Sequence, residues 1–445
     1  MTEGESLDRL QALVAAARAA GADAADAILA RGASLSVARR LGAVEKVERA
    51  EELDLGLRVF VGQRQAIVSS TDPDPRGFAA LAERAVAMAR AVPEDRFAGL
   101  PPDTPRFTPP ALDLEDPAEP DVAALTERAA MAEDAARAVP GVSNSEGAEA
   151  GWSRTAVALV SSAGFAGAYA RTGHSLSVSA LAGSGTGMER DYDASSAVHL
   201  GDLEDPATLG RNAGERAVRR LNPRRPATAR LPVVYDPRVA ASLLGHLSAA
   251  INGAAVARGT SFLRDALGQP VLARGLCVRD DPTRPRGLRS RPFDGEGLPG
   301  QPRAVVENGV LTTWILDWRS ARQLGLASTG HASRGVSGPP SPGTTNLWLE
   351  PGTLSPAELM ADITEGIYVT ELIGMGVNGL TGDYSRGAAG FMIRNGALAE
   401  PVSELTIAGN LRDMFRAMTP ASDLRFRRGT DSPTVRVEGL TIAGG

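Results

Sequence analysis

The first half of the chain combines two hydrophobic periods, one typical of helices and the other typical of strands. Apolar residues recur every three or four positions in four segments, which predicts helices at 7–20, 77–92, 122–139 and 206–220. Shorter segments favour strands, at 27–29, 34–39, 43–48, 53–61, 65–69, 142–148, 154–161, 166–182 and 188–199. Because Gly and Ser turns separate these strands, we expect a largely antiparallel sheet flanked by helices.

Two proline-rich stretches divide the chain. Residues 92–120 hold too many prolines for regular structure, which indicates an extended connection across a surface within the N-terminal half. The second stretch, 221–228, is the expected domain boundary. The sequence therefore predicts an α+β protein of two domains: an N-terminal α+β domain over 1–222 and a β-rich C-terminal domain over 230–445.

The C-terminal half is dense in glycine and in short β-like runs. A strand is expected at 231–235, followed by a strongly helical segment at 238–257. Brief helices are expected at 320–324, 355–366 and 410–418.

Composition and charge narrow the classes of protein that fit. The chain has 445 residues, 43% of them hydrophobic, and a formal net charge of −6. Direct nucleic-acid binding is not expected, because such proteins usually carry a basic stripe. No apolar run approaches the ~20 residues that span a bilayer, and the first residues lack the basic-then-apolar pattern of a signal peptide. We therefore expect a cytoplasmic protein without membrane contact.

The residues that most often bind metals or act as nucleophiles are few. The four histidines, His174, His199, His246 and His331, do not pair at helical spacing, and H-E-x-x-H is absent. A zinc site assembled from distant histidines stays open as the less favoured alternative. His331, in a polar loop beside a glycine, has the best case for facing a functional cleft. Cys277 is the only cysteine, which excludes an intrachain disulfide, and its apolar neighbours favour a buried thiol.

Gly374–Gly379 matches the pattern G-x-G-x-x-G and follows a predicted strand at 367–373. A dinucleotide site would need a helix to begin at this point, with its N-terminus facing the pyrophosphate. Residues 380–390 are too rich in glycine to sustain a helix. The pattern is therefore interpreted as a glycine-rich β-loop, where another backbone can approach closely.

Other catalytic patterns are incomplete as well. Asp280, Asp281, Asp294 and Glu296 lack a second cluster of ligands and are interpreted as turn and ion-pair residues rather than metal ligands. The serine-nucleophile motifs G-x-S-x-G and S-x-x-K are absent, as is the G-K-[ST] of a phosphate-binding loop. The residues alone show no complete set of catalytic groups.

Six strings in the C-terminal half are more distinctive than any single motif. They are Arg258-Gly-Thr-Ser-Phe262, Leu288-Arg-Ser-Arg-Pro-Phe-Asp-Gly-Glu-Gly297, Ser341-Pro-Gly-Thr-Thr-Asn-Leu347, Tyr368-Val-Thr-Glu-Leu372, Gly382-Asp-Tyr-Ser-Arg-Gly-Ala-Ala-Gly-Phe391 and Thr406-Ile-Ala-Gly-Asn-Leu411. Taken in this order, they resemble the TldD/PmbA family, and specifically its PmbA branch, also called TldE. The resemblance covers essentially the whole C-terminal domain, and the N-terminal layout agrees with it more loosely.

The resemblance implies a two-subunit zinc peptidase in which the TldD partner holds the metal. That partner carries H-E-x-x-x-H on a helix and a cysteine near its C-terminus. Here the positions that match the motif are Leu244, Gly245 and Ala249, and the segment after Phe426 contains no cysteine. The resemblance therefore implies a metal-free PmbA/TldE subunit without catalytic residues or a cofactor of its own, inactive alone, beside a zinc-holding TldD-like partner.

The same resemblance implies that the two subunits enclose a chamber for an extended or unfolded peptide. The residues expected to face this chamber are His331, Arg334, Gly374, Gly376, Asn378, Gly379 and Arg386. A first alternative is a non-enzymatic interaction or regulatory protein of the gyrase-modulator type, acting as a homodimer. A second is a stand-alone hydrolase that uses His331 and distant acids.

Overall fold

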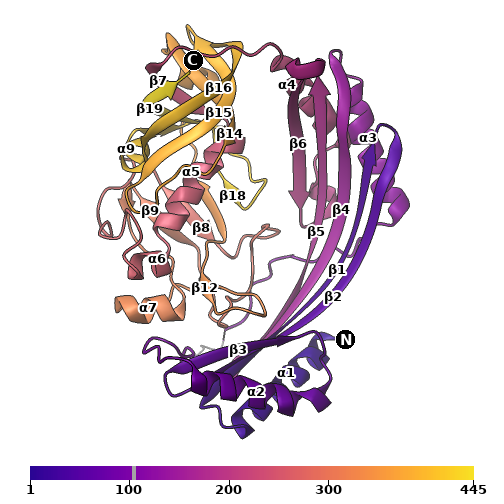
Figure 1. Cartoon of the computed structure of the whole chain (residues 1–445), viewed down its shortest axis with the longest axis vertical. Coiled ribbons are helices and arrows are strands. Elements are labelled where there is room, and N and C mark those ends of the chain that lie inside the picture. The colour runs from indigo at the N-terminus through magenta and orange to yellow at the C-terminus, as the bar shows by residue number, and fades with distance from the viewer. Residues whose placement is uncertain (103–106, 445) are drawn as a thin grey trace.

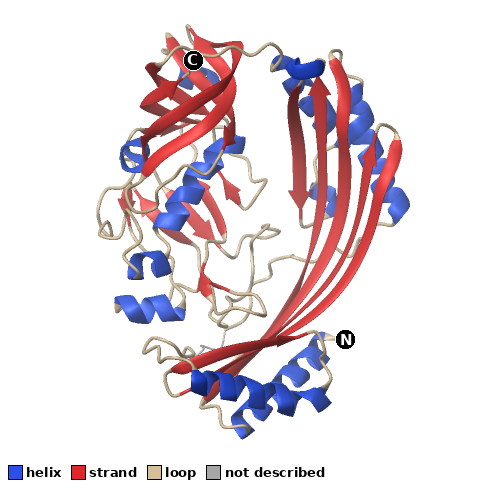
Figure 2. Ribbon diagram, in the orientation of Figure 1, coloured by secondary structure: helices blue, strands red, loops and turns tan. Residues whose placement is uncertain are grey.

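A long, curved sheet forms one side of the molecule, and the C-terminal half of the chain lies on its concave side (Figures 1 and 2). The structure, a computed structural model, describes residues 1–102 and 107–444. Its longer helices are α1 (Glu3–Ala19), α2 (Phe78–Ala91), α3 (Val122–Arg137), α4 (Pro206–Arg219) and α5 (Pro237–Ala250). Shorter helices are α6 (Gly253–Ala257), α7 (Trp318–Leu324), α8 (Pro356–Met360) and α9 (Leu411–Arg416). The arrangement confirms the predicted α+β class.

The N-terminal sheet contains six strands in the order β3-β2-β1-β4-β5-β6, and each neighbouring pair is antiparallel. Its strands are β1 (Ala24–Arg40), β2 (Ala43–Val61), β3 (Arg64–Ser70), β4 (Val142–Ser161), β5 (Ala166–Ala182) and β6 (Glu189–Ala197). The predicted antiparallel sheet is therefore confirmed. Strand β6 is hydrogen-bonded to a neighbouring strand on one side only, which leaves it as an edge of the sheet.

Three of these strands are about twice as long as the predicted pieces. The expected interruptions near 30–33, 49–52 and 149–153 do not exist, because β1, β2 and β4 run through them in continuous register. Gly32 pairs with the exposed Glu52 in the middle of this ladder. Helices cover the two ends of the sheet but not its middle. Polar side chains therefore break the hydrophobic alternation there without breaking the backbone hydrogen bonds.

Alternate side chains of β1 face two different parts of the molecule, as a strand's period of two requires. Leu29 packs in a core with α1 and α2, and Leu35 packs in a second core with α3 and α4. Ile28, on the opposite face, packs with Phe165 and Phe293, the latter from the C-terminal half. The sheet thus binds helices on one face and the C-terminal domain on the other.

The C-terminal domain is built around a sheet that closes on itself. Strand β19 pairs with both β7 and β16, so five strands form a ring with β17 attached at its edge. The strands of this sheet are β7 (Ala229–Tyr235), β14 (Glu365–Ile373), β15 (Asp383–Arg394), β16 (Ala397–Asn410), β17 (Met418–Pro420) and β19 (Val435–Ala443). Helix α5 packs its apolar side into the same large core.

Two smaller sheets complete this domain. The first has the order β10-β9-β8-β13-β18, and the second pairs β11 with β12. Their strands are β8 (Val278–Asp281), β9 (Arg303–Glu307), β10 (Val310–Leu311), β11 (Ala332–Ser333), β12 (Ser341–Pro342), β13 (Asn346–Leu349) and β18 (Thr430–Asp431). No helix of the described residues is both long and apolar enough to cross a membrane.

The structure differs from two local predictions, the helix at 238–257 and the surface path of the proline-rich stretch. The single helix expected at 238–257 is wrong: α5 and α6 are separate, because the Asn252 side chain accepts hydrogen bonds from the amides of Ala254 and Ala255 and starts a new helix. The proline-rich stretch holds no helix or strand over 92–102 and 107–120, while 103–106 lie outside the described residues. It does not stay at the surface, since Leu112 and Leu114 are buried and accept backbone hydrogen bonds from both domains.

A buried group of four charged side chains joins the sheet to the C-terminal domain. We call Asp26, Arg58, Glu296 and Arg334 the interdomain ion network. Arg58 and Asp26 face each other on β2 and β1, with 3.1 Å between Arg58 Nε and Asp26 Oδ2. Arg334 Nη1 lies 2.7 Å from Asp26 Oδ1, and Arg58 Nη1 lies 3.9 Å from Glu296 Oε1. Each of the four side chains is at most 4% exposed.

Burial acts differently on the two carboxyl groups of this network. It opposes ionisation of Asp26, but Arg334 and Arg58 outweigh it and hold the pKa of Asp26 below its ordinary value. Glu296 has only the more distant Arg58 and the Trp318 amide as partners. Burial therefore dominates at Glu296 and raises its pKa to about 8.

Candidate functional site

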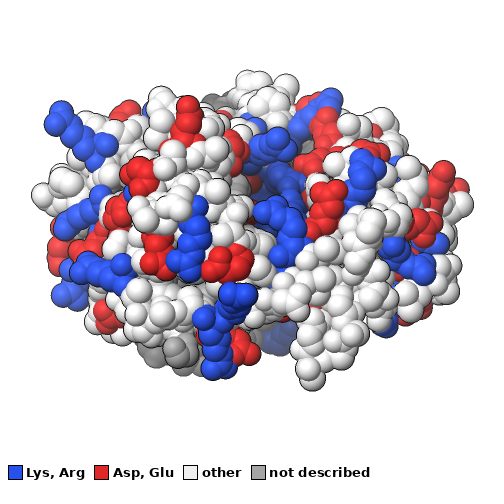
Figure 3. Space-filling view, turned by 90° about the horizontal axis from the view of Figure 1, so that it is seen from above, with Lys and Arg blue, Asp and Glu red and all other residues white. Residues whose placement is uncertain are grey.

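Arginines gather in a cleft between the upper part of the sheet and the C-terminal domain. Two adjoining cavities of about 270 and 310 Å³ share Arg427, Arg428 and Asp431 in their walls. Seen from above, the molecule has a hollow along which blue, basic side chains are concentrated (Figure 3). We call this place the arginine cleft. Its arginines are Arg216, Arg238, Arg284, Arg286, Arg425, Arg427 and Arg428.

Four of these arginines form ion pairs that connect distant parts of the chain. Arg238, at the start of α5, lies 2.6 Å from Asp191 of β6 and 3.2 Å from Asp236. Burial disfavours its charge, but these two carboxylates outweigh burial and raise the pKa of Arg238. Arg427 lies 2.7 Å from Glu204. The remaining two pairs are Arg216–Asp193 and Arg286–Asp113. The pairs Arg238–Asp191, Arg427–Glu204 and Arg286–Asp113 join the two halves of the chain, whereas Arg216–Asp193 lies within the first half.

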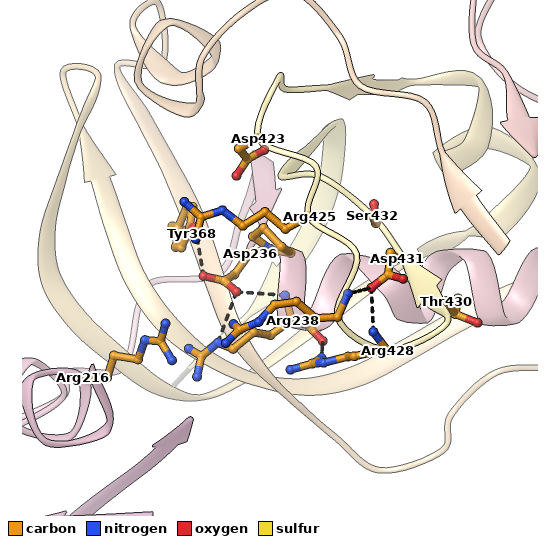
Figure 4. A pocket seen from close by; sticks show the side chains of 12 residues that line it. Arg216, Asp236, Arg238, Tyr368, Asp423, Arg425, Arg428, Thr430, Asp431 and Ser432 are labelled. Carbon is orange, nitrogen blue, oxygen red and sulfur yellow. Dashed lines mark hydrogen bonds and ion pairs between the residues drawn. The ribbon is translucent and has the colours of Figure 1, made fainter. Parts of the chain in front are cut away.

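Arg284, Arg425 and Arg428 differ from this group, because none of them forms an ion pair with a carboxylate of the described residues. Arg284 lies against the ring of Phe426, with its guanidinium carbon 3.4 Å from the ring centroid. Burial lowers the pKa of Arg284, and the carboxylates of Asp431 and Asp281, which form no ion pair with it, offset this only in part. Arg425 extends toward Tyr368 in Figure 4. Arg428 donates a hydrogen bond of 2.8 Å to the carbonyl oxygen of Arg238.

The loop that carries three of these arginines is held in place by Asp431. One oxygen of this carboxylate accepts the amides of Arg427 and Arg428, at 2.9 and 3.0 Å, and the other accepts the amide of Gly429 at 3.1 Å. Two of these contacts are drawn in Figure 4. A carboxylate that binds three successive amides fixes the loop backbone and loses much of its capacity to pair with arginine side chains. The loop is thus ordered, while two of its guanidinium groups, those of Arg425 and Arg428, form no ion pair with a described carboxylate.

The positions that match the zinc motif lie on α5, whose first residues, Pro237 and Arg238, line the arginine cleft. Leu244 is part of the core, whereas Gly245 and Ala249 are exposed. Helix α5 packs against β18, which follows the Arg427–Gly429 segment directly. The structure thus brings together the two segments in which the resemblance locates the missing zinc ligands, and they meet at the arginine cleft.

The residues at this place do not fit a zinc ion. Leu244, Gly245 and Ala249 carry no side-chain atom that can bind metal. His246, one position away, packs its ring against Tyr384 with 6.0 Å between centroids, and burial lowers its pKa. Across the described residues, His, Cys, Asp and Glu side chains form no group of three or more that could hold a metal ion. No reaction step is therefore assigned to a metal in this chain.

His331 and Arg334 do not line the arginine cleft, and their place in a chamber shared with a partner stays a prediction. His331 has no exposed surface; its Nε2 lies 2.9 Å from Asp280 Oδ1 and its Nδ1 lies 2.8 Å from the Thr329 carbonyl. The Arg334 side chain is equally buried and belongs to the interdomain ion network. Both are polar residues of loops that fold inward, because each finds a buried carboxylate partner.

Four of the other predicted chamber residues belong to one exposed turn before β15, and Arg386 lies on β15 itself. Gly374, Gly376, Asn378 and Gly379 are exposed, and the chain continues into a strand rather than a helix, as the β-loop interpretation requires. A side chain at Gly376 would place its Cβ 2.0 Å from the Ser385 carbonyl oxygen, so only glycine fits there. Arg386 donates to the Ile373 carbonyl at 3.3 Å. None of these residues lines the arginine cleft.

Sequence reasoning missed the arginine cleft itself. The local signal was Arg425-Phe-Arg-Arg428, an unusual run of three arginines around an aromatic residue. Its partners come from residues near 113, 191–204, 236–238 and 284–286, which only the fold brings together.

Comparison with known proteins places the chain among metallopeptidase-related sequences. Three consecutive regions match one family: residues 25–89 match PmbA/TldA metallopeptidase domain 1, residues 115–221 its central domain, and residues 228–444 its C-terminal domain. The first two regions supply the strands of the single N-terminal sheet, and the third supplies the C-terminal domain.

Curated relatives agree with this match over nearly the full length. The chain is 38% identical to metalloprotease PmbA of Escherichia coli O157:H7 over 425 residues, which is 95% of this chain and 92% of the relative. It is 36% identical to the metalloprotease PmbA homolog of Haemophilus influenzae over 431 residues, covering 96% and 93% of the two chains.

Solved structures show the same architecture. A protein of Bacteroides thetaiotaomicron, described as a candidate modulator of DNA gyrase, superposes with a TM-score of 0.90 at 27% identity and covers 99% of both chains. TldE from Thermococcus kodakarensis superposes with a TM-score of 0.87 at 21% identity over 98% of this chain and 100% of that one, a likeness of fold.

Proposed function

The chain belongs to the PmbA/TldD family of metallopeptidase-related proteins, and we propose that it is the metal-free, TldE-type subunit of a zinc peptidase. In this proposal a TldD-like partner holds the zinc ion and performs the hydrolysis. The chain described here helps to enclose an extended or unfolded peptide and holds it for the partner. It is inactive by itself.

One observation carries this proposal. The helix that matches the zinc-binding helix of the family offers leucine, glycine and alanine at the ligand and base positions, Leu244, Gly245 and Ala249. Restoring the ligands would require a histidine at Leu244, which is fully packed in the core. A subunit whose matching helix carries no metal-binding side chain at these positions is suited to binding rather than to hydrolysis.

The cleft also offers an edge strand for an extended peptide. Strand β6 has a neighbouring strand only at β5, and Ser196 and Ala197, around its last residue, line one of the two cavities. A peptide that adds to a free sheet edge is held through its backbone, which gives low sequence selectivity. This property suits a subunit that handles unfolded chains.

Exposed apolar side chains support a protein partner. Ile373, Met375 and Leu380, in the loop between β14 and β15, are 57, 90 and 56% exposed. Neighbouring apolar side chains left in water are typical of surfaces that another protein covers. We expect Met375→Glu to weaken binding of the TldD-like partner in an analytical ultracentrifugation titration, while Leu354→Glu, a charge change at another exposed leucine, should leave it unchanged.

Reconstitution tests the proposal directly. Zinc content and cleavage of an unfolded peptide are measured for this chain alone, for the TldD-like protein of the same genome alone, and for their mixture. Cleavage that requires both chains and stops on addition of a chelator is expected. Stoichiometric zinc in the purified chain, or cleavage by the chain alone, would overturn the proposal.

A second candidate function follows from the structural relative described as a candidate modulator of DNA gyrase. In it, the chain acts as a non-enzymatic homodimer that regulates another protein. Its net charge of −6 makes direct DNA contact unfavourable, so such an effect would pass through protein contacts. A homodimer that binds gyrase but no TldD-like chain in a pull-down with purified proteins would favour this alternative.

A further inference from the structure

Some of the arginines that line the arginine cleft form no ion pair with a carboxylate of the described residues. Seven arginines line its two cavities, against the four aspartates Asp202, Asp236, Asp423 and Asp431. Of these four, Asp431 is occupied by backbone amides, and Asp423 accepts the amide and hydroxyl of Thr434. Four of the seven arginines pair with Asp113, Asp191, Asp193 and Glu204, so the unmatched positive charge of the cleft lies on Arg284, Arg425 and Arg428.

The unpaired arginines are also held in place. The guanidinium carbon of Arg284 lies 3.4 Å from the ring centroid of Phe426 and 5.7 Å from that of Trp348. Phe426 and Trp348 in turn contact each other edge to face at 5.5 Å. Rings of this kind support a guanidinium without neutralising it, so its donor groups remain free for an anion. Arg428 is held by the Arg238 carbonyl, and its loop is held by Asp431.

A carboxylate is the anion that best matches these surroundings. Guanidinium groups bind carboxylates through two parallel hydrogen bonds. The carboxylates already in the walls would repel a nucleic-acid backbone with its repeated phosphates, whereas a single carboxylate can reach the unpaired arginines between them. Phe426, which is 47% exposed, adds an apolar surface next to the arginines for a neighbouring side chain of the ligand.

We propose that the arginine cleft is a carboxylate-binding site that anchors peptide substrates, through Arg284, Arg425 and Arg428. The carboxylate comes from an acidic side chain or from the C-terminus of the peptide. This inference rests on the proposed function in its choice of a peptide, and it adds an electrostatic selectivity that edge-strand pairing alone lacks.

The test measures peptide binding to the purified full-length chain without its partner, by fluorescence anisotropy. Three extended peptides of equal length are compared: one with acidic side chains and an amidated C-terminus, one neutral with a free C-terminus, and one neutral and amidated. A single-stranded oligonucleotide is the fourth probe. Tighter binding of either or both carboxylate-bearing peptides than of the neutral amidated peptide is expected, and the two arms identify the source of the carboxylate.

Variants then assign the effect to the cleft. Arg284→Gln with Arg425→Gln should weaken binding of the preferred peptide about tenfold, the effect of losing a charged hydrogen bond, and should leave the neutral amidated peptide unchanged. Arg425→Gln alone is a second variant that breaks no ion pair of the described residues. Arg76→Gln removes an equal charge from a side chain that is 91% exposed elsewhere and should change nothing.

Each outcome separates this inference from the proposed function. Equal binding of all three peptides, an unchanged affinity in the variants, or preference for the oligonucleotide would overturn the carboxylate site. Cleavage by the reconstituted pair would then still support the proposed function. Conversely, carboxylate-dependent binding that the variants abolish, with no cleavage on reconstitution, would support the site and remove the peptidase role.

Discussion

Two of the places where the two domains meet differ in how their charged side chains are paired. In the interdomain ion network, Asp26, Arg58 and Arg334 are almost completely buried and their charges are paired with one another, while the equally buried Glu296 has a pKa raised to about 8. In the arginine cleft, Arg284, Arg425 and Arg428 have no such partner among the described residues, although four neighbouring arginines do. The difference separates residues that fix the fold from residues that remain available to a ligand.

This contrast has a physical basis. A buried charge without a partner costs several kcal/mol, so the network can exist only because its charges are matched. The cleft is open to water, which lowers the cost of unmatched charge and lets the chain keep it. Substitutions in the network should therefore change stability, and substitutions of the unpaired arginines should change binding.

The largest effect is expected from Asp26→Asn. The substitution removes the carboxylate that binds both Arg58 and Arg334 and leaves two buried guanidinium groups unmatched. We expect the free energy of unfolding to fall by about 3–5 kcal/mol in chemical denaturation. Asp265→Asn, which removes an exposed partner of Arg264, is the control and should cost less than about 0.5 kcal/mol. Equal losses in the two variants would contradict the assigned role of the network.

The pH dependence of stability tests the same network at Glu296. Its pKa in the folded chain is about 8, above the ordinary value of 4.5, so the folded state keeps a proton that the unfolded state releases between these values. Stability from this group is therefore complete below pH 4.5 and is lost as the pH rises toward 8. Glu296→Gln cannot ionise and should be more stable than the wild type at pH 9, by on the order of 2–4 kcal/mol, and similar to it at pH 4.5.

The measurement compares melting curves of the wild type and the variant between pH 4.5 and 9. Differences between the two chains cancel the titration of distant groups. Asp294, whose pKa burial also raises, interacts with Glu296, so the difference reports the titration of this pair. Glu83→Gln, at an exposed position of α2, should shift the curve equally at all pH values. A wild-type chain whose stability relative to Glu296→Gln rises with pH would show that Glu296 ionises readily in the fold.

A smaller effect is expected in the cleft from Phe426→Ala. The ring supports the guanidinium of Arg284 and is itself 47% exposed, so its loss should change binding more than stability. We expect the affinity for a carboxylate-bearing peptide to fall about fivefold, the equivalent of one cation–π contact. Leu326→Ala, at an exposed position of similar accessibility, is the control. A fall in affinity for the neutral amidated peptide as well would mean that the ring binds the peptide directly.

The sequence pattern predicted the helices and strands of this protein better than the positions of its charged side chains. The α+β class, the antiparallel sheet and the β-loop at Gly374–Gly379 follow from local periodicity and turn residues, which the fold preserves. Local pattern could not show that His331 and Arg334 turn inward, because their partners Asp280 and Asp26 are 51 and 308 positions away. The cleft was missed for the same reason, since its walls come from stretches of the chain that lie far apart in sequence.

The smallest effect on stability is expected within the cleft itself, from Arg425→Gln. Arg425 makes no ion pair with a described carboxylate, so its loss should change the free energy of unfolding by less than about 0.5 kcal/mol. Arg238→Gln is the matched variant in the same cleft: it is buried and breaks the pairs with Asp191 and Asp236, and should cost at least about 2 kcal/mol. Chemical denaturation and peptide binding are measured on both. A small loss of unfolding free energy for Arg425→Gln together with weaker peptide binding would show that paired and unpaired arginines of the cleft have separate roles. Equal losses of unfolding free energy in the two variants would mean that Arg425 is structural.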